Sequence, residues 1–73
     1  METIEINTET IQLDQLLKWA GIIESGGQVK LLLADELIKL NGVIETAKRR
    51  KIKAGDVIEI VGEGTWKVVR QGE

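Results

Sequence analysis

The chain of 73 residues contains no cysteine, histidine, proline, tyrosine or phenylalanine. Without cysteine it can form neither a disulfide nor a zinc–thiolate site, and it has no thiolate nucleophile. Without histidine it lacks the side chain that serves most often as a general base or a metal ligand. These absences exclude most catalytic constellations, so we expect no catalytic residues, no metal site and no cofactor.

Long hydrophobic runs are missing as well. The longest uninterrupted apolar run is Leu31–Ala34, whereas a membrane-spanning helix needs about 20 apolar residues. The first ten residues have neither the basic region nor the apolar stretch of a signal peptide. With 42% hydrophobic residues and no linker or repeat, residues 1–73 are expected to form one cytoplasmic domain without a membrane segment.

Charge is divided unequally along the chain. The net charge is −2, yet residues 1–47 carry three basic and eight acidic side chains, and residues 48–73 carry seven basic and four acidic ones. Five of those seven lie in the basic segment, defined here as Lys48-Arg49-Arg50-Lys51-Ile52-Lys53. Like charges packed so closely repel each other, and phosphates of a polyanion relieve that repulsion. An incidental, solvated loop is the alternative interpretation of the segment.

Two short helices are predicted in the first half of the chain. Apolar residues recur at the spacing of one helical face in two stretches, first Leu13, Leu16, Leu17 and Ala20, then Val29, Leu32, Leu33 and Leu37. Gly21 suits the position just after the first helix, and the Ser25 side chain can cap the start of the second. Together they would form an αα-corner.

The other segments favour β-structure. Strand patterns occupy residues 3–6, 37–40, 43–44, 57–61 and 65–69. Asn41-Gly42 predicts a type I′ hairpin turn, because both residues tolerate positive φ. Residues 7–10 and the basic segment are predicted to be a turn and a loop. The fold class is therefore α+β, with the two-helix corner packed on a small, mostly antiparallel sheet.

Several short motifs follow one another in a distinctive order within residues 11–60. They are a leucine-rich first helix ending at Ala20-Gly21, a second helix opened by Ser25, Leu40-Asn41-Gly42, the basic segment, and Lys53-Ala54-Gly55-Asp56-Val57-Ile58. This order is similar to that of the alpha-L RNA-binding motif, the domain named after ribosomal small-subunit protein S-four. The flanking strands and Ser25-Gly26-Gly27 resemble the stand-alone bacterial members of that family. Many members carry an arginine directly after the serine, where this chain has Gly26-Gly27.

The resemblance implies a non-catalytic, monomeric domain that binds structured RNA, either ribosomal RNA or a ribosome-assembly particle. The RNA would lie between the helix corner and the basic loop. Backbone N–H groups at a helix start can receive a phosphate oxygen, and arginine forks can bind phosphate in a bidentate manner. The candidate RNA-binding residues are Ser25, Gly26, Gly27, Gln28, Lys30, Lys48, Arg49, Arg50, Lys51, Lys53 and Lys18. Because the arginine is missing, most weight falls on Lys30 and the basic segment.

Other conspicuous residues are assigned structural roles. Trp19 and Trp66, the two aromatic residues, could stack on bases, but are predicted to fill the core or its rim. Asn41-Gly42 and Asp56 are predicted to organise turns rather than to bind a ligand.

Two alternative functions stay open on the sequence. Asn41-Gly42 followed by Gly55-Asp56-Val57-Ile58 also resembles the second half of a ubiquitin-like sulfur carrier or related β-grasp protein, although the chain lacks the Gly-Gly terminus of a carrier. A helix at residues 28–34 would favour the alpha-L motif, and a strand there the β-grasp fold. The other alternative is a protein–protein adaptor whose basic loop docks an acidic partner.

Overall fold

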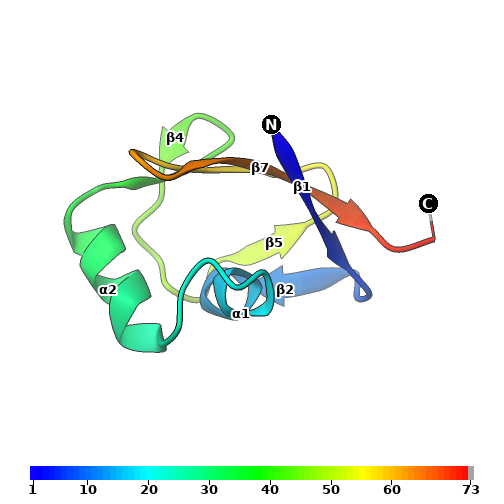
Figure 1. Cartoon of the computed structure of the whole chain (residues 1–73), viewed down its shortest axis with the longest axis horizontal. Helices are drawn as coiled ribbons and strands as arrows, with labels where there is room; N and C mark the ends of the chain where they lie inside the picture. The colour runs from blue at the N-terminus through cyan, green and yellow to red at the C-terminus, as the bar shows by residue number, and fades with distance from the viewer. Residues whose placement is uncertain (73) are drawn as a thin grey trace.

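The fold consists of a five-stranded sheet, a separate two-stranded ribbon and two helices (Figure 1). The computed structural model describes residues 1–72. Its elements are β1 (Glu2–Ile6), β2 (Thr10–Gln12), α1 (Leu13–Trp19), α2 (Gly26–Ala34), β3 (Ile38–Leu40), β4 (Val43–Ile44), β5 (Lys51–Lys53), β6 (Val57–Ile60) and β7 (Gly64–Arg70). The large sheet has the order β1-β7-β6-β3-β4, and only the β1–β7 pairing is parallel. The predicted class, two helices on a mostly antiparallel sheet, is confirmed.

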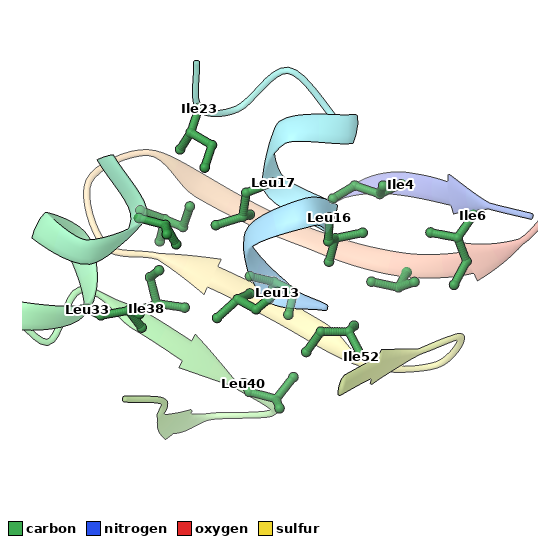
Figure 2. Packing of buried hydrophobic residues seen from close by; sticks show 14 residues of the cluster. Ile4, Ile6, Leu13, Leu16, Leu17, Ile23, Leu33, Ile38, Leu40 and Ile52 are labelled. Atoms are coloured by element: carbon green, nitrogen blue, oxygen red, sulfur yellow. The ribbon is translucent and has the colours of Figure 1, made fainter. Parts of the chain in front are cut away.

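The core lies between one face of the large sheet and the helices (Figure 2). Strand alternation directs Ile38 and Leu40 of β3 toward the same side as Ile58 and Ile60 of β6. The helices cover this face with the predicted apolar stripes, whose buried members are Leu13, Leu16, Leu17, Val29 and Leu33. Three predicted stripe members are not fully buried, of which Leu32 is half-buried and packs against the core. Ala20 is exposed because α1 has already ended, and Leu37 is only half-buried beyond the end of α2.

The helix at residues 26–34 separates the two folds considered from the sequence. A β-grasp protein would have a strand in this region, whereas α2 spans Gly26–Ala34. The β-grasp alternative is therefore not supported. Within residues 1–72, neither helix has the length and apolar character needed to cross a membrane.

The ribbon formed by β2 and β5 is the main departure from the prediction. Thr10 was predicted to lie in a turn and residues 51–53 in a loop, and Ile11 and Gln12 were assigned to no element, but residues 10–12 and 51–53 pair as antiparallel strands with Ile11 opposite Ile52. Ile52 is fully buried, and Ile11 packs against the core. Burial of this isoleucine pair explains why two three-residue segments so far apart in the chain become strands.

The two tryptophans occupy different environments. Trp66 is half-buried and packs against the core, as predicted. Trp19 was also predicted to fill the core or its rim, but it is 62% exposed and does not belong to the core. Its indole Nε1 donates a 2.8 Å hydrogen bond to the carbonyl oxygen of Glu5. Since β1 is an edge strand, this bond satisfies a carbonyl that would otherwise be open to pairing with another chain.

Both helices end in Schellman motifs, but with different residues at the left-handed position. After α1, Gly21 (φ +74°) donates to Lys18 O and Ile22 donates to Leu17 O. After α2, Glu36 (φ +57°) donates to Leu33 O and Leu37 donates to Leu32 O. Glycine adopts this conformation without steric cost, whereas a side chain at position 36 is strained by its Cβ.

The two helix ends predict stability changes of opposite sign. Glu36→Gly should raise the free energy of unfolding by roughly 0.5–1 kcal/mol, because relief of αL strain exceeds the entropy cost of glycine. Gly21→Ala should lower it by about 1 kcal/mol; a Cβ there meets no atom within 4 Å, so the cost is conformational. Urea titration of both variants measures the effects, and destabilisation by Glu36→Gly would contradict this account.

Candidate nucleic-acid interface

Backbone carbonyl groups of the basic segment cap the start of α1. The first N–H groups of any helix lack partners within the helix, and the N-cap residue of α1, Gln12, makes no side-chain capping bond. Instead Leu13 N–H donates to Arg50 O at 2.8 Å, and Asp14 N–H donates to Lys48 O at 3.2 Å. The basic segment is therefore fixed against α1 by its own backbone.

This anchoring brings Lys48 to the first turn of α2. A Cβ built on Gly26 would lie 3.2 Å from Lys48 Nζ and 3.6 Å from Lys48 Cε. The ammonium group thus rests over the residue that follows the helix-opening serine, where many alpha-L motifs carry arginine. Glycine leaves the room that this approach needs, and Lys48 supplies a positive charge at the same helix end.

The charges at the start of α2 are unbalanced. A helix N-terminus carries a partial positive charge, and the first turn of α2 contains no acidic residue. The Lys48 ammonium therefore faces a second positive centre. The N–H groups of Gly26 and Gly27 have no acceptor among residues 1–72. An anion placed here would gain from both the ammonium group and the helix end.

Ser25 and Gln28 mainly build this helix end. Ser25 is the N-cap residue, as predicted, and forms a capping box with Gln28. The Gln28 Oε1 atom accepts hydrogen bonds from the N–H groups of Glu24 and Ser25. The Gln28 N–H, predicted as a phosphate donor, is bonded to Ser25 O at 3.2 Å. The N–H groups that remain for a ligand are those of Gly26 and Gly27.

The remaining lysines on the helices differ in position. Lys30 is exposed and lies four residues after Gly26, on the same side of α2, so it extends the Lys48 surface by one turn. Lys18 lies in the last turn of α1, whereas Lys48 and Arg50 contact its first turn. That separation is about 7 Å along the helix axis. The structure thus brings Lys30 to the basic segment but leaves Lys18 at the other end of α1.

The two arginines are not equivalent. Arg50 Nε lies 3.5 Å from Glu45 Oε1, and Glu45 Oε2 accepts the N–H groups of Thr46 and Ala47 at 2.9 and 3.1 Å. Glu45 therefore fixes the two residues that precede the basic segment, and it orients Arg50, whose side chain is still 57% exposed. Arg49 is also exposed and makes no ion pair within residues 1–72. Solvent around the exposed Arg50 side chain weakens its attraction to Glu45, so a phosphate can compete for the guanidinium.

Lys51 and Lys53 project from the outer face of the ribbon. They alternate with the buried Ile52, so both side chains point away from the core. Their cross-strand partners are Gln12 and Thr10, respectively. A strand, rather than the predicted loop, therefore holds these two lysines at a fixed spacing of roughly 6.6 Å.

A hydrogen-bonded pair, Asn41 and Asp56, lies at the C-terminal end of the basic segment. Asp56 Oδ2 accepts the Lys53 N–H at 2.9 Å, and Asp56 Oδ1 accepts Asn41 Nδ2 at 3.1 Å. Asn41 Oδ1 accepts the Val57 N–H at 2.9 Å. The predicted turn roles of Asn41 and Asp56 are confirmed. The hydrogen bond that joins the two turns was not predicted, since their residues are 15 positions apart.

The acidic side chains of the described residues gather in no metal-binding cluster. Residues 1–72 hold no group of three or more metal-ligating side chains. Asp14, in the first turn of α1, has a buried Oδ1 without a hydrogen-bond partner in that part of the chain. Its negative charge lies next to the N–H groups of the helix start, where it is favourable.

Known proteins resemble the chain over almost its whole length. The family model described as S4 domain matches residues 4–69. A Bacillus subtilis protein named "Probable ribosome maturation protein RlbA" is 42% identical over 66 residues, which cover 90% of this chain and 93% of that protein. The solution structure of Escherichia coli YbcJ, described as revealing an alpha-L motif involved in RNA binding, superposes with a TM-score of 0.71 at 37% identity. That match covers 94% of this chain and 87% of YbcJ.

A double-mutant cycle tests whether the two turns at the end of the basic segment are coupled. Asn41→Gly keeps a residue suited to φ +52° while removing the amide, and Asp56→Ala removes the carboxylate. Each should lower the free energy of unfolding by roughly 1–3 kcal/mol, because backbone N–H groups lose their acceptors. The double variant should show a coupling energy of about 0.5–3 kcal/mol in urea titrations. Strict additivity would show that the Asn41–Asp56 bond contributes nothing.

Proposed function

The chain belongs to the S4 domain family, and we propose that it binds structured RNA, in particular ribosomal RNA or a particle in ribosome assembly. Family membership rests on the match over residues 4–69. The proposal is for binding without catalysis, by a monomer in the bacterial cytoplasm, with the interface formed by the start of α2, the basic segment and the outer face of β5.

The observation that carries the proposal is the position of the Lys48 ammonium at the start of α2. The Lys48 ammonium group lies at the positive end of the helix, where two backbone N–H groups have no acceptor within residues 1–72. Without an anion this arrangement is repulsive, and with a phosphate it becomes attractive. The neighbouring cations Lys30, Arg49, Lys51 and Lys53 are exposed and can follow a phosphate backbone.

RNA fits this interface better than an isolated phosphate compound does. The cations extend from α2 along the basic segment to the end of β5, a row of charges rather than a closed pocket. A-form RNA is recognised largely by its shape and its backbone, because side chains cannot read its narrow major groove. The relatives support the same ligand class, since YbcJ is described as having an RNA-binding motif and RlbA is named as a ribosome maturation protein.

Docking of an acidic protein is the competing function. It would use the same basic segment, but it would need no anion at the backbone N–H groups of Gly26 and Gly27. Binding of purified ribosomal RNA in the presence of excess polyglutamate distinguishes the two, because the RNA complex should persist. Crosslinking in cells, followed by sequencing of the attached RNA, would then identify the target; recovery of no RNA above background would favour the adaptor.

The first functional prediction concerns the arginine pair. Arg49→Ala with Arg50→Ala should weaken binding to purified ribosomal RNA several-fold and lower the slope of log affinity against log salt by about two. The fold should persist, because Arg50 caps α1 through its backbone carbonyl, which alanine retains.

The matched control removes two cations from the other face of the large sheet. Lys39 alternates with the buried Ile38 and Leu40, and Lys67 precedes the buried Val68. Lys39→Ala with Lys67→Ala therefore changes net charge equally, at positions directed away from the core and the helices. Equal loss of binding in both double variants would show only a net-charge effect and would contradict the proposed interface.

The second functional prediction concerns Lys48. Lys48→Met keeps most of the aliphatic stem but removes the ammonium group that faces the start of α2. The free protein should gain roughly 0.3–1 kcal/mol of stability, because a repulsion with the helix end is lost. RNA binding should nevertheless become several-fold weaker. Lys30→Met, one turn further along α2, is the control, and it should weaken binding without stabilising the free protein. A destabilised Lys48→Met variant would contradict the repulsion.

A further inference from the structure

The outer face of the β2–β5 ribbon carries two polar side chains beside its two lysines. Antiparallel register places Thr10 opposite Lys53 and Gln12 opposite Lys51, so all four side chains emerge on the face that Ile11 and Ile52 do not occupy. The basic segment runs directly into this face, because Lys51–Lys53 is both its end and strand β5. The face therefore continues the proposed RNA interface.

The amide of Gln12 is not committed to the fold. A residue in its position normally caps the helix that follows, but Gln12 makes no side-chain capping bond. The N–H groups it would cap are already taken by the carbonyl oxygens of Arg50 and Lys48. The residue is half-buried, and its amide makes no hydrogen bond to another group within residues 1–72.

Thr10 presents a similar group two residues earlier. It is exposed, and in residues 1–72 its hydroxyl group has no hydrogen-bond partner; only its backbone carbonyl is used, as acceptor for Thr8 Oγ1 at 2.8 Å. Positions i and i+2 of a strand face the same side. A hydroxyl and an amide, each able to donate and accept, therefore lie in a row beside a row of two cations.

This pattern matches the minor groove of an A-form helix. That groove is wide and shallow, and it displays ribose 2′-hydroxyl groups between two phosphate backbones. Lysines offer charge to phosphates but cannot accept a hydrogen bond, whereas Gln12 and Thr10 can both donate to and accept from a 2′-hydroxyl. We propose that the ribbon lies on the minor groove of double-helical RNA, with Lys51 and Lys53 on phosphates and Thr10 and Gln12 on 2′-hydroxyl groups. This inference rests on the proposed function and specifies which feature of the RNA is read.

The test compares isosteric variants on three matched duplexes. Thr10→Val and Gln12→Met keep the shape of each side chain and remove its polar end. Lys51→Met with Lys53→Met removes the cations instead. The probes are an RNA stem-loop, the same stem-loop with 2′-fluoro groups along the stem, which keeps the A-form but has no hydroxyl donor, and the DNA stem-loop.

The wild-type chain should prefer the RNA stem-loop to both analogues. The Thr10→Val/Gln12→Met variant should lose roughly ten-fold in affinity for the RNA stem-loop, since two neutral hydrogen bonds are removed, and should bind the 2′-fluoro stem-loop as the wild type does. The lysine variant should bind all three probes more weakly than the wild type does. The ratios of its affinities for the three probes should equal those of the wild type. Circular dichroism melting of each variant confirms that it is folded.

The outcomes separate this inference from the proposed function. If the wild-type chain binds none of the probes and no purified ribosomal RNA, the proposed function fails and the inference fails with it. If the wild type binds the RNA stem-loop, but the Thr10→Val/Gln12→Met variant has the same ratio of affinities for the RNA and 2′-fluoro stem-loops as the wild type, only the inference is overturned. Equal wild-type affinity for RNA and 2′-fluoro stem-loops would overturn it too.

Discussion

The proposed interface depends on the two hydrogen bonds through which the basic segment caps α1. A helix of seven residues is too short to be stable alone, and its first N–H groups need acceptors. The carbonyl oxygens of Arg50 and Lys48 provide them. The dependence is mutual, because a run of like charges would otherwise extend into solvent. The amphipathic helix and the cationic segment therefore stabilise each other's conformation, and the proposed binding surface forms as a consequence of folding.

Capping by backbone rather than by side chains leaves the charged groups available for a ligand. Lys48 and Arg50 meet the needs of α1 with their carbonyl groups, and the burial of Ile52 fixes the strand that follows. Their ammonium and guanidinium groups are thus positioned before a ligand arrives. Preorganisation of this kind lowers the entropy cost of binding, and the repulsion held in the free protein adds to the gain when phosphates neutralise it.

The sequence was sufficient for the features governed by local chemistry. Gly21 after α1 and Asn41-Gly42 between β3 and β4 are in the predicted left-handed conformations, and Ser25 opens α2. What it did not reveal depends on long-range contacts. The Ile11–Ile52 pairing, the approach of Lys48 to Gly26 and the Asn41–Asp56 bond each join residues between 15 and 41 positions apart. Lys51-Ile52-Lys53 shows the polar–apolar alternation of a strand. A single apolar residue between two lysines does not, however, reveal which distant segment pairs with it.

The positions of the charges in the folded chain, which the sequence does not reveal, explain how a chain of net charge −2 can present the proposed interface for a polyanion. Electrostatic interactions at physiological salt decay over about 8 Å. Lys48 lies at the first residue of α2, whereas Asp35, at its other end, shares a surface groove with Glu63. Nine helical residues separate the two ends by about 13 Å, so the Asp35 carboxylate is screened from a phosphate bound at Gly26. Glu45, which does lie close, is engaged by two backbone N–H groups and by Arg50. A phosphate therefore experiences mainly the charges within one screening length, and around the start of α2 Lys48 and Lys30 outnumber the exposed carboxylate of Glu24, two residues before Gly26.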